Sequence, residues 1–170
     1  MSSELRVDTI KLANGNSATA SGLGIDIGNT GKIAQQVVSS TTTSIMSTSS
    51  SFIDTGLSLN ITPSSATSTI NLFCGIPIRM DAEGGTDNGM KLQFLRDSTG
   101  IWVGDGNQLY LYGGSSYAET NFQWTQYVSD SPNTTSQITY KVQSARNGNT
   151  RFTVMLNSRA GYLVAQEVLA

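Results

Sequence analysis

Apolar and polar residues alternate with a period of two along most of the chain from residue 33 onward. Leu57, Leu59 and Ile61, for example, are separated by single polar residues. A period of two is that of a β-strand, whose successive side chains point to opposite faces. No segment repeats its apolar residues at helical spacing over three turns. The segments that predict strands are residues 33–40, 52–62, 67–80, 90–94, 101–103, 109–112, 122–128, 138–142, 152–156 and 162–169.

Two of these segments are more apolar than simple alternation requires. Residues 67–80 form the most apolar stretch, which predicts a central strand with both faces covered. Pro77 within it predicts a bulge or a point where the strand reaches a sheet edge, because proline cannot donate to the ladder. The last strand, residues 162–169, also carries apolar residues on both faces.

The turn signals between the segments set the expected fold class. Residues 147–149 (Asn-Gly-Asn) separate two alternating segments and predict a hairpin between residues 138–142 and 152–156. About nine or ten short strands at spacings of about 8 to 12 residues are typical of two packed antiparallel sheets. The sequence therefore predicts an all-β protein, an antiparallel β-sandwich of jelly-roll type.

The first 31 residues differ from the rest of the chain in composition. Residues 4–12 could form one strand, but residues 13–31 are mostly Gly, Asn, Ser, Thr and Ala. Ordering such a segment alone costs about 1 to 2 kcal/mol per residue, which its few apolar side chains do not offset. We therefore expect residues 1–31 to be an extended arm that docks on other chains and residues 32–170 to be the β-sandwich head. A flexible tail is the alternative. The expected assembly contacts are Leu5, Val7, Ile10, Leu12, Leu23, Ile25 and Ile27.

Composition excludes several classes of protein. The 170 residues contain 23 Ser and 20 Thr but no His and one Cys, Cys74, which excludes a His/Cys zinc site, a Ser-His-Asp triad and an internal disulfide. The net charge of -2, with dispersed Lys and Arg, disfavours nucleic acid as a partner. No apolar run of membrane-spanning length or signal peptide is present, so we expect no membrane insertion. Cys74 lies in an apolar run and is expected to be buried and inert.

Carboxylates offer the only candidate catalytic or metal chemistry. The acidic loop at residues 81–89 supplies oxygen ligands, but its spacing does not match a calcium loop, so a solvated hairpin loop is favoured. Glu83 with Asp87, or Glu119 with Asp130, could be imagined as a glycosidase pair. Any chain with 12 acidic residues yields such pairs. We therefore expect no enzyme, no metal and no cofactor.

Aromatic residues concentrate in the second half of the chain. Tyr and Trp beside Asn, Gln and Ser suit sugar rings, because the ring face stacks on C–H patches while amides bind hydroxyls. The same residues also fill sandwich cores and intersubunit contacts, and that interpretation is favoured. The candidates for a glycan or receptor contact are Trp102, Tyr110, Tyr112 and Tyr117.

Three segments resemble a pattern in fibre and appendage proteins of marine tailed bacteriophages. They are SELRVDTIK at residues 3–11, which resembles the virion-anchoring N-terminus of those proteins, STSSSFIDTGLSLNITPSS at residues 47–65, and YLVAQEV at residues 162–168, which is similar to their closing strand. Together the segments bracket most of the chain.

The resemblance implies a structural, non-enzymatic virion protein without a cofactor. Such proteins are often homotrimers whose N-terminal segment attaches to capsid, portal or tail proteins and whose β-rich head projects. Full tail fibres are usually longer, so the length also suits a short tail fibre, a head fibre or a capsid decoration protein. The expected location is the virion, after synthesis and folding in the bacterial host cytoplasm. The alternative function is host attachment as a receptor- or glycan-binding, lectin-like module.

Overall fold

The computed structural model describes residues 31–83, 88–105, 109–111, 117–148 and 150–170. The expected assembly contacts Leu5, Val7, Ile10, Leu12, Leu23, Ile25 and Ile27 lie outside the described residues, as does Tyr112. The strands are β1 (Ile33–Thr41), β2 (Ile45–Ser47), β3 (Ile53–Ile61), β4 (Thr69–Glu83), β5 (Asn88–Arg96), β6 (Thr99–Val103), β7 (Tyr110–Leu111), β8 (Tyr117–Asp130), β9 (Ile138–Gly148), β10 (Thr150–Val154) and β11 (Gly161–Val168), with a short 3-10 helix, η2 (Leu156–Ser158), between the last two.

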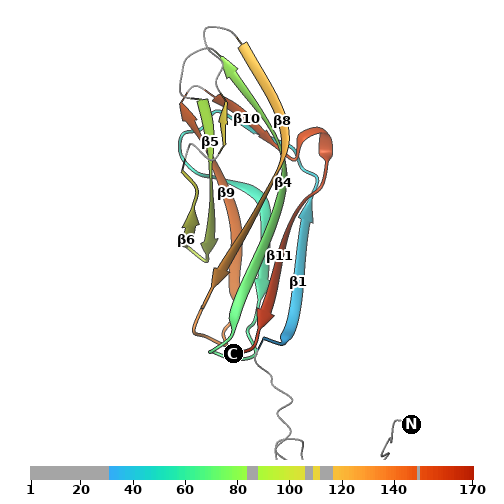
Figure 1. Cartoon of the computed structure of the whole chain (residues 1–170), viewed down its shortest axis with the longest axis vertical. Helices are drawn as coiled ribbons and strands as arrows, with labels where there is room; N and C mark the ends of the chain where they lie inside the picture. Colours follow the sequence, from blue (N-terminus) through green and yellow to red (C-terminus); the bar gives the residue numbers. More distant parts are fainter. Residues whose placement is uncertain (1–30, 84–87, 106–108, 112–116, 149) are drawn as a thin grey trace, which may run out of the picture.

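The strands form two antiparallel sheets packed face to face (Figure 1). In the first sheet β4 is central: β8 pairs with one side of it, and β11 and β10 pair one after the other with its other side. β1 and β2 continue that sheet beyond β11 and β10. The second sheet has the order β3-β9-β5-β6, with β7 also pairing with β5. The predicted all-β sandwich is confirmed.

The strand pairs are nested along the chain. β1 pairs with β11, β3 with β9, β4 with β8, and β5 with β6, all antiparallel. Successive pairs alternate between the two sheets. A chain folded back on itself in nested antiparallel pairs and wrapped over two sheets is a jelly roll. The pairing therefore confirms the predicted topology.

The hairpin predicted across residues 147–149 is wrong. β9 belongs to the second sheet, where it pairs with β3 and β5, whereas β10 belongs to the first, where it pairs with β4 and β2. The chain crosses between sheets here, and Gly148 has the positive φ of 67° that redirects it. Asparagine and glycine suit a crossing as well as a tight turn, so the local signal could not distinguish the two.

Pro77 marks no bulge in β4, but it lies where one side of the strand has no partner, which is the edge position that was predicted. The register between β4 and β8 runs unbroken from Ile70 to Glu83, with Pro77 opposite Gln123. On the other side of β4, the partner strand is interrupted: β11 pairs as far as Gly75, and β10 starts opposite Ile78. The residues that connect β10 to β11 include η2 and loop away from the sheet. Proline is tolerated because its neighbour, rather than its own strand, is broken there.

Inward-facing side chains of both sheets fill the core. Leu57, Leu72, Ile76, Phe94 and Phe152 are almost fully buried. Cys74 belongs to this cluster, as predicted, and burial raises the pKa of its thiol above the ordinary range. A thiol held protonated in the core is a poor nucleophile. No helix in the described part of the chain is long and apolar enough to cross a membrane.

Two polar contacts, each with one fully buried partner, tie the sheets together. The hydroxyl of Tyr140, a fully buried residue of β9, donates to Asp130 Oδ2 of β8 at 2.6 Å, and Arg96 Nη1 of β5 donates to the same carboxylate at 2.9 Å. Burial, and then the bond to Asp130, raises the pKa of Tyr140 above its ordinary value. The tyrosine therefore remains a neutral donor that bridges β9 and β8.

Glu167 forms the second contact at the end of β11. Its buried carboxylate accepts from Gln35 Nε2 at 2.7 Å and from the backbone N–H and hydroxyl of Ser64 at 2.7 and 2.8 Å. Burial alone would raise the pKa of Glu167, but these hydrogen bonds outweigh it and lower the pKa from 4.5 to about 2. The charged carboxylate thus holds the loop after β3 against β1 and β11.

Candidate functional site

The outer face of the first sheet carries a row of apolar side chains that crosses four neighbouring strands, β1, β11, β4 and β8. Val38 of β1 is opposite Val164 of β11, Val164 is opposite Phe73 of β4, and Phe73 is opposite Tyr127 of β8. We call these four residues the apolar row. Val38 is 57% exposed, Phe73 38% and Tyr127 50%, while Val164 is half-buried. The row therefore presents hydrocarbon to solvent in the single chain.

The rings in the apolar row are held in fixed positions. Phe73 and Tyr127 lie with ring centroids 5.2 Å apart and planes inclined at 46°. The Tyr127 hydroxyl donates to Asn71 Oδ1 at 2.9 Å, which fixes the ring along the sheet. Directly opposed side chains on a sheet stabilise one another by roughly 0.2 to 1 kcal/mol per pair. The row is therefore a preformed surface.

Tyr162 extends this surface towards the middle of the sheet. It lies opposite Gly75, and its ring covers that glycine so closely that a methyl group there would overlap the ring. Phe73, Tyr127 and Tyr162, with Thr125 and Gln126, line a shallow depression of about 230 Å³. The missing side chain at Gly75 is what lets an aromatic ring lie flat on the strand.

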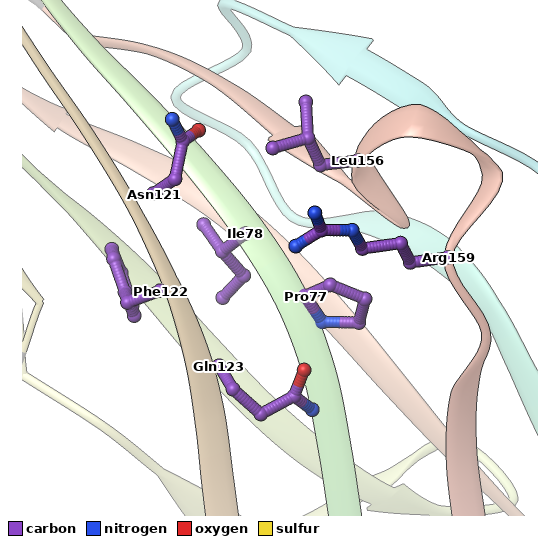
Figure 2. Close-up of a pocket in the computed structure, with 7 residues that line it drawn as sticks. All are labelled: Pro77, Ile78, Asn121, Phe122, Gln123, Leu156 and Arg159. Atoms are coloured by element: carbon purple, nitrogen blue, oxygen red, sulfur yellow. The ribbon is translucent and has the colours of Figure 1, made fainter.

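A second cleft lies further along the same face, where the strand beside β4 is interrupted (Figure 2). Pro77 and Ile78 form its floor, β8 contributes Asn121 and Gln123, and Arg159 reaches over it from the connection between β10 and β11. Its volume is about 130 Å³. The cleft is smaller than the aromatic depression, and it carries one cationic side chain.

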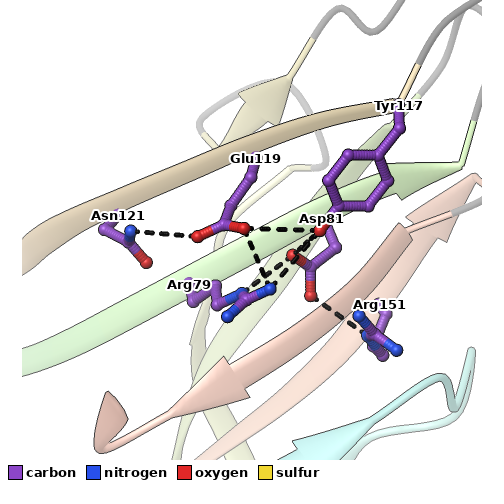
Figure 3. A network of polar contacts seen from close by, with 6 residues as sticks. All are labelled: Arg79, Asp81, Tyr117, Glu119, Asn121 and Arg151. Carbon is purple, nitrogen blue, oxygen red and sulfur yellow. Dashed lines mark hydrogen bonds and ion pairs between the residues drawn. The ribbon is translucent and has the colours of Figure 1, made fainter. Parts of the chain in front are cut away.

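The far end of this face is polar and internally satisfied (Figure 3). Asp81, whose side chain is nearly buried, accepts from Arg79 Nε at 2.8 Å, from the Tyr117 hydroxyl at 2.7 Å and from Arg151 Nε at 3.0 Å. Arg79 also pairs with Glu119 at 2.9 Å. Burial alone would raise the pKa of Asp81, but these donors lower it. Because protein donors occupy both carboxylate oxygens, the network has a structural role: it links β8, β4 and β10.

The three predicted glycan contacts that the structure describes are not gathered on one surface. Trp102 of β6 packs against the core, with ring centroids 5.8 Å from Phe94 and 6.1 Å from Trp124. Tyr110 is exposed on β7 of the second sheet. Tyr117 lies on the first sheet, in the Asp81 network. Trp102 and Tyr117 therefore do not share a face.

Of the acidic candidates, the pair that the structure describes is also far apart. Glu119 and Asp130 lie near opposite ends of β8, about 36 Å apart at strand spacing, far beyond the separation of a glycosidase pair. Among the described residues, no group of three or more metal-ligating side chains is placed to hold an ion. Asp87 and the side chain of Glu83 lie outside the description. That the chain is not an enzyme and needs no cofactor stays a prediction.

Sequence reasoning did not select Val38, Phe73, Tyr127 and Tyr162 as site residues. Alternation correctly places Tyr127 on the face opposite Trp124 and Val128, but it does not say which face is inside. The signal that could have found the site is the final strand, where Tyr162 and Val164 are apolar on the side opposite buried Leu163 and Ala165. A strand that is apolar on both faces needs cover on both.

Comparisons with known proteins give only distant similarity. No family model matches the chain, and no curated protein matches it. Among solved structures it is similar to infectious bursal disease virus, Gx strain (TM-score 0.40, 12% identity, 96% of this chain and 43% of that chain), and to the VP2 subviral particle of that virus (0.37, 12%, 81% and 38%). It is also similar to the T=1 particles derived from the virus (0.37, 13%, 96% and 41%).

The chain spans about two fifths of the length of those virus chains. Similarity at TM-scores of 0.34 to 0.40 is too distant to assign a function. The resemblance of three segments to fibre and appendage proteins of marine tailed bacteriophages is a separate observation and stays a prediction.

Proposed function

We propose that this chain is a structural, non-enzymatic virion protein of tail-fibre, head-fibre or capsid-decoration type. Residues 1–31 anchor it to other virion proteins, and the β-sandwich projects. The resemblance of residues 3–11, 47–65 and 162–168 to phage appendage proteins supports this function. Jelly rolls occur in viral capsid proteins and in lectins, so the fold suits the proposal without deciding it.

The observation that carries the proposal is the apolar row on the outer face of the first sheet. A row of exposed apolar and aromatic side chains across four neighbouring strands is the kind of surface that another chain covers. Fully burying one large apolar side chain contributes about 1.5 to 3 kcal/mol. Three copies that shared such contacts would gain this free energy at each contact, which favours a homotrimer.

Particle incorporation tests the proposal directly. The full chain and a chain lacking residues 1–31 are supplied to particles deficient in the protein, and bound protein is measured after particle purification. The full chain should be incorporated, and the shortened chain should stay in solution with an unchanged β-sheet circular dichroism spectrum. Normal incorporation of the shortened chain would contradict the anchoring role, and failure of the full chain to associate with any particle would contradict the virion assignment.

Glycan binding is the second candidate function, and the depression lined by Phe73, Tyr127 and Tyr162 favours it. Aromatic rings beside Thr125 and Gln126 offer the stacking and hydrogen-bonding groups that sugars use. A glycan array with the full chain tests it, with Tyr162→Ala as the loss-of-binding variant and Tyr110→Ala as the control on the other sheet. Absence of binding at millimolar saccharide would exclude this function.

A further inference from the structure

The apolar row has the size and character of a docking site for a short extended segment. It crosses three inter-strand spacings from Val38 to Tyr127, about 14 Å. The flanking rows on either side are uncharged: one is Gln36, Gln166, Asn71 and Ser129, and the other is Ser40, Tyr162, Gly75 and Thr125. An apolar strip bordered by amides and hydroxyls fits an apolar segment of low charge.

One segment of the chain has that composition. Leu23, Ile25 and Ile27 alternate with Gly24 and Asp26, so three large apolar side chains fall on one side when the segment is extended. From Leu23 to Ile27 an extended chain covers about 13 Å, which matches the length of the apolar row. Serine, glycine, asparagine and threonine surround the segment, and Asp26 is its single charge.

Residues 23–27 of the same chain cannot all lie on the row. The described chain starts at Gly31, whose N–H donates to the Leu169 carbonyl at 2.8 Å, beside the end of β11. Val38 lies seven residues further along β1, about 23 Å away. Ile27 is four residues before Gly31 and lies at most about 14 Å from it when the chain is fully extended, so it cannot reach the row. Leu23, eight residues before Gly31, can span about 29 Å, but docking of the whole segment also needs Ile27.

We propose that residues 23–27 of a second copy of this chain dock across the apolar row. Leu23, Ile25 and Ile27 cover Val38, Val164, Phe73 and Tyr127 of the neighbouring copy, and Asp26 points to solvent. The inference rests on the proposed assembly function and names its interface. It also explains why an arm too poor in apolar residues to fold by itself gains order within the assembly.

A cysteine pair tests this docking in the full chain. The double variant Ile25→Cys with Val38→Cys is treated with a short bismaleimide and separated on a denaturing gel, while native Cys74 stays buried and unmodified. The expected result is covalent dimers and higher bands. The matched control is Ile25→Cys with Val103→Cys: Val103 is as exposed as Val38 but lies on the second sheet, and at least tenfold less cross-linking is expected.

The other outcomes separate this inference from the proposed function. Cross-linking only within one chain would overturn it, because the arm would cover its own sandwich. No cross-linking in a protein that is still oligomeric would overturn the docking but not the assembly, and no cross-linking in a monomer would contradict both.

A second experiment tests the docking without the double-cysteine variant, in case that variant misfolds. Leu23→Asp, Ile25→Asp and Ile27→Asp together, in the full chain carrying Val38→Cys, should raise the maleimide labelling rate of that cysteine at least tenfold. An unchanged rate, or protection of Val38→Cys by added saccharide rather than by the arm, would overturn the docking.

Discussion

The outer faces of the two sheets have the same geometry but opposite chemistry. The first sheet presents the apolar row, whereas the corresponding row of the second sheet runs from Asp54 through Gln143 and Gln93 and ends at the exposed Val103 of β6. We call Asp54, Gln143 and Gln93 the amide row. Gln93 Nε2 donates to Gln143 Oε1 at 2.6 Å, and Gln143 Nε2 donates to Asp54 Oδ1 at 2.7 Å. The amide row satisfies its own polar groups, while the apolar row leaves hydrocarbon exposed.

The comparison teaches that the jelly roll alone does not create a binding surface. Both faces are built from alternating strands over one core, and side chains at outward positions decide which face remains in water. The polar side chains of the amide row are well hydrated in solvent. The apolar side chains of Val38, Phe73 and Tyr127 are instead stabilised when another chain covers them. The same kind of substitution should therefore have different effects on the two faces.

A charge in the apolar row should have the largest effect. Phe73→Asp places a carboxylate where another chain would cover it, and desolvation of an unpaired charge is costly. We expect at least a hundredfold increase in the dissociation constant of the assembly, measured by sedimentation equilibrium. Ser58→Asp, on the outer face of β3 opposite Lys141, is the matched control and should leave the constant within threefold. Equal effects of the two substitutions would contradict a functional difference between the faces.

Acid should weaken the sheet that carries the apolar row through Glu167. Its folded-state pKa of about 2 lies below its ordinary value of 4.5, so its contribution to stability is complete above pH 4.5 and is lost as the pH falls towards 2. We expect the free energy of unfolding, measured by urea denaturation, to fall by about 2 kcal/mol over that range. Glu167→Gln should be less stable at pH 7 and should lose that part of the pH dependence. An unchanged acid slope in this variant would contradict the role of Glu167.

Removing the hydroxyl of a buried and of an exposed tyrosine compares the stability of the interior with that of the outer face. Tyr140→Phe removes from the buried side of Asp130 its 2.6 Å donor and should lower the free energy of unfolding by about 1 to 2 kcal/mol. Tyr127→Phe removes a hydroxyl from an exposed ring and should change it by less than about 0.5 kcal/mol. Thermal and urea unfolding of both variants measure the difference, and a larger loss for Tyr127→Phe would contradict the assignment of the two residues to core and surface.

Removal of the amide row should have a small effect on stability and none on assembly. Gln143→Ala breaks both hydrogen bonds of the row on a half-exposed surface, and such bonds contribute only about 0.5 to 1 kcal/mol net. We expect a loss of that size in the free energy of unfolding and no change in the solution mass measured by light scattering. A change in mass would show that the second face also takes part in assembly.

The fold could be predicted because alternation is a local property. Leu57, Leu59 and Ile61, and likewise Trp124 and Val128, point into the core as their spacing indicates. The crossing at Gly148 could not be predicted, because a turn within one sheet and a step between sheets use the same residues. The expectation that both faces of residues 67–80 are covered is half correct. β4 is central, but its outer face at Phe73 is open in the single chain.

The site was harder to predict because it depends on pairs that are distant in sequence. Phe73 meets Tyr127 on one side and Val164 on the other, at separations that no local pattern encodes. Trp102 was a reasonable candidate by residue type, yet its pairing with Phe94 turns the ring towards the core. Residue type identified aromatic candidates, and strand register decided which of them reach solvent.

Labelling of two matched cysteines tests most directly whether other chains cover the apolar row. Val38 and Val103 are both 57% exposed in the single chain and lie on the outer faces of the first and second sheets. Val38→Cys and Val103→Cys, each made in the full chain, are labelled with a maleimide under native conditions, with Phe73→Asp added to each as the dissociated reference. We expect Val38→Cys to react at least tenfold more slowly than Val103→Cys in the assembled protein and at a similar rate in the reference. Equal rates in the native protein would contradict the account.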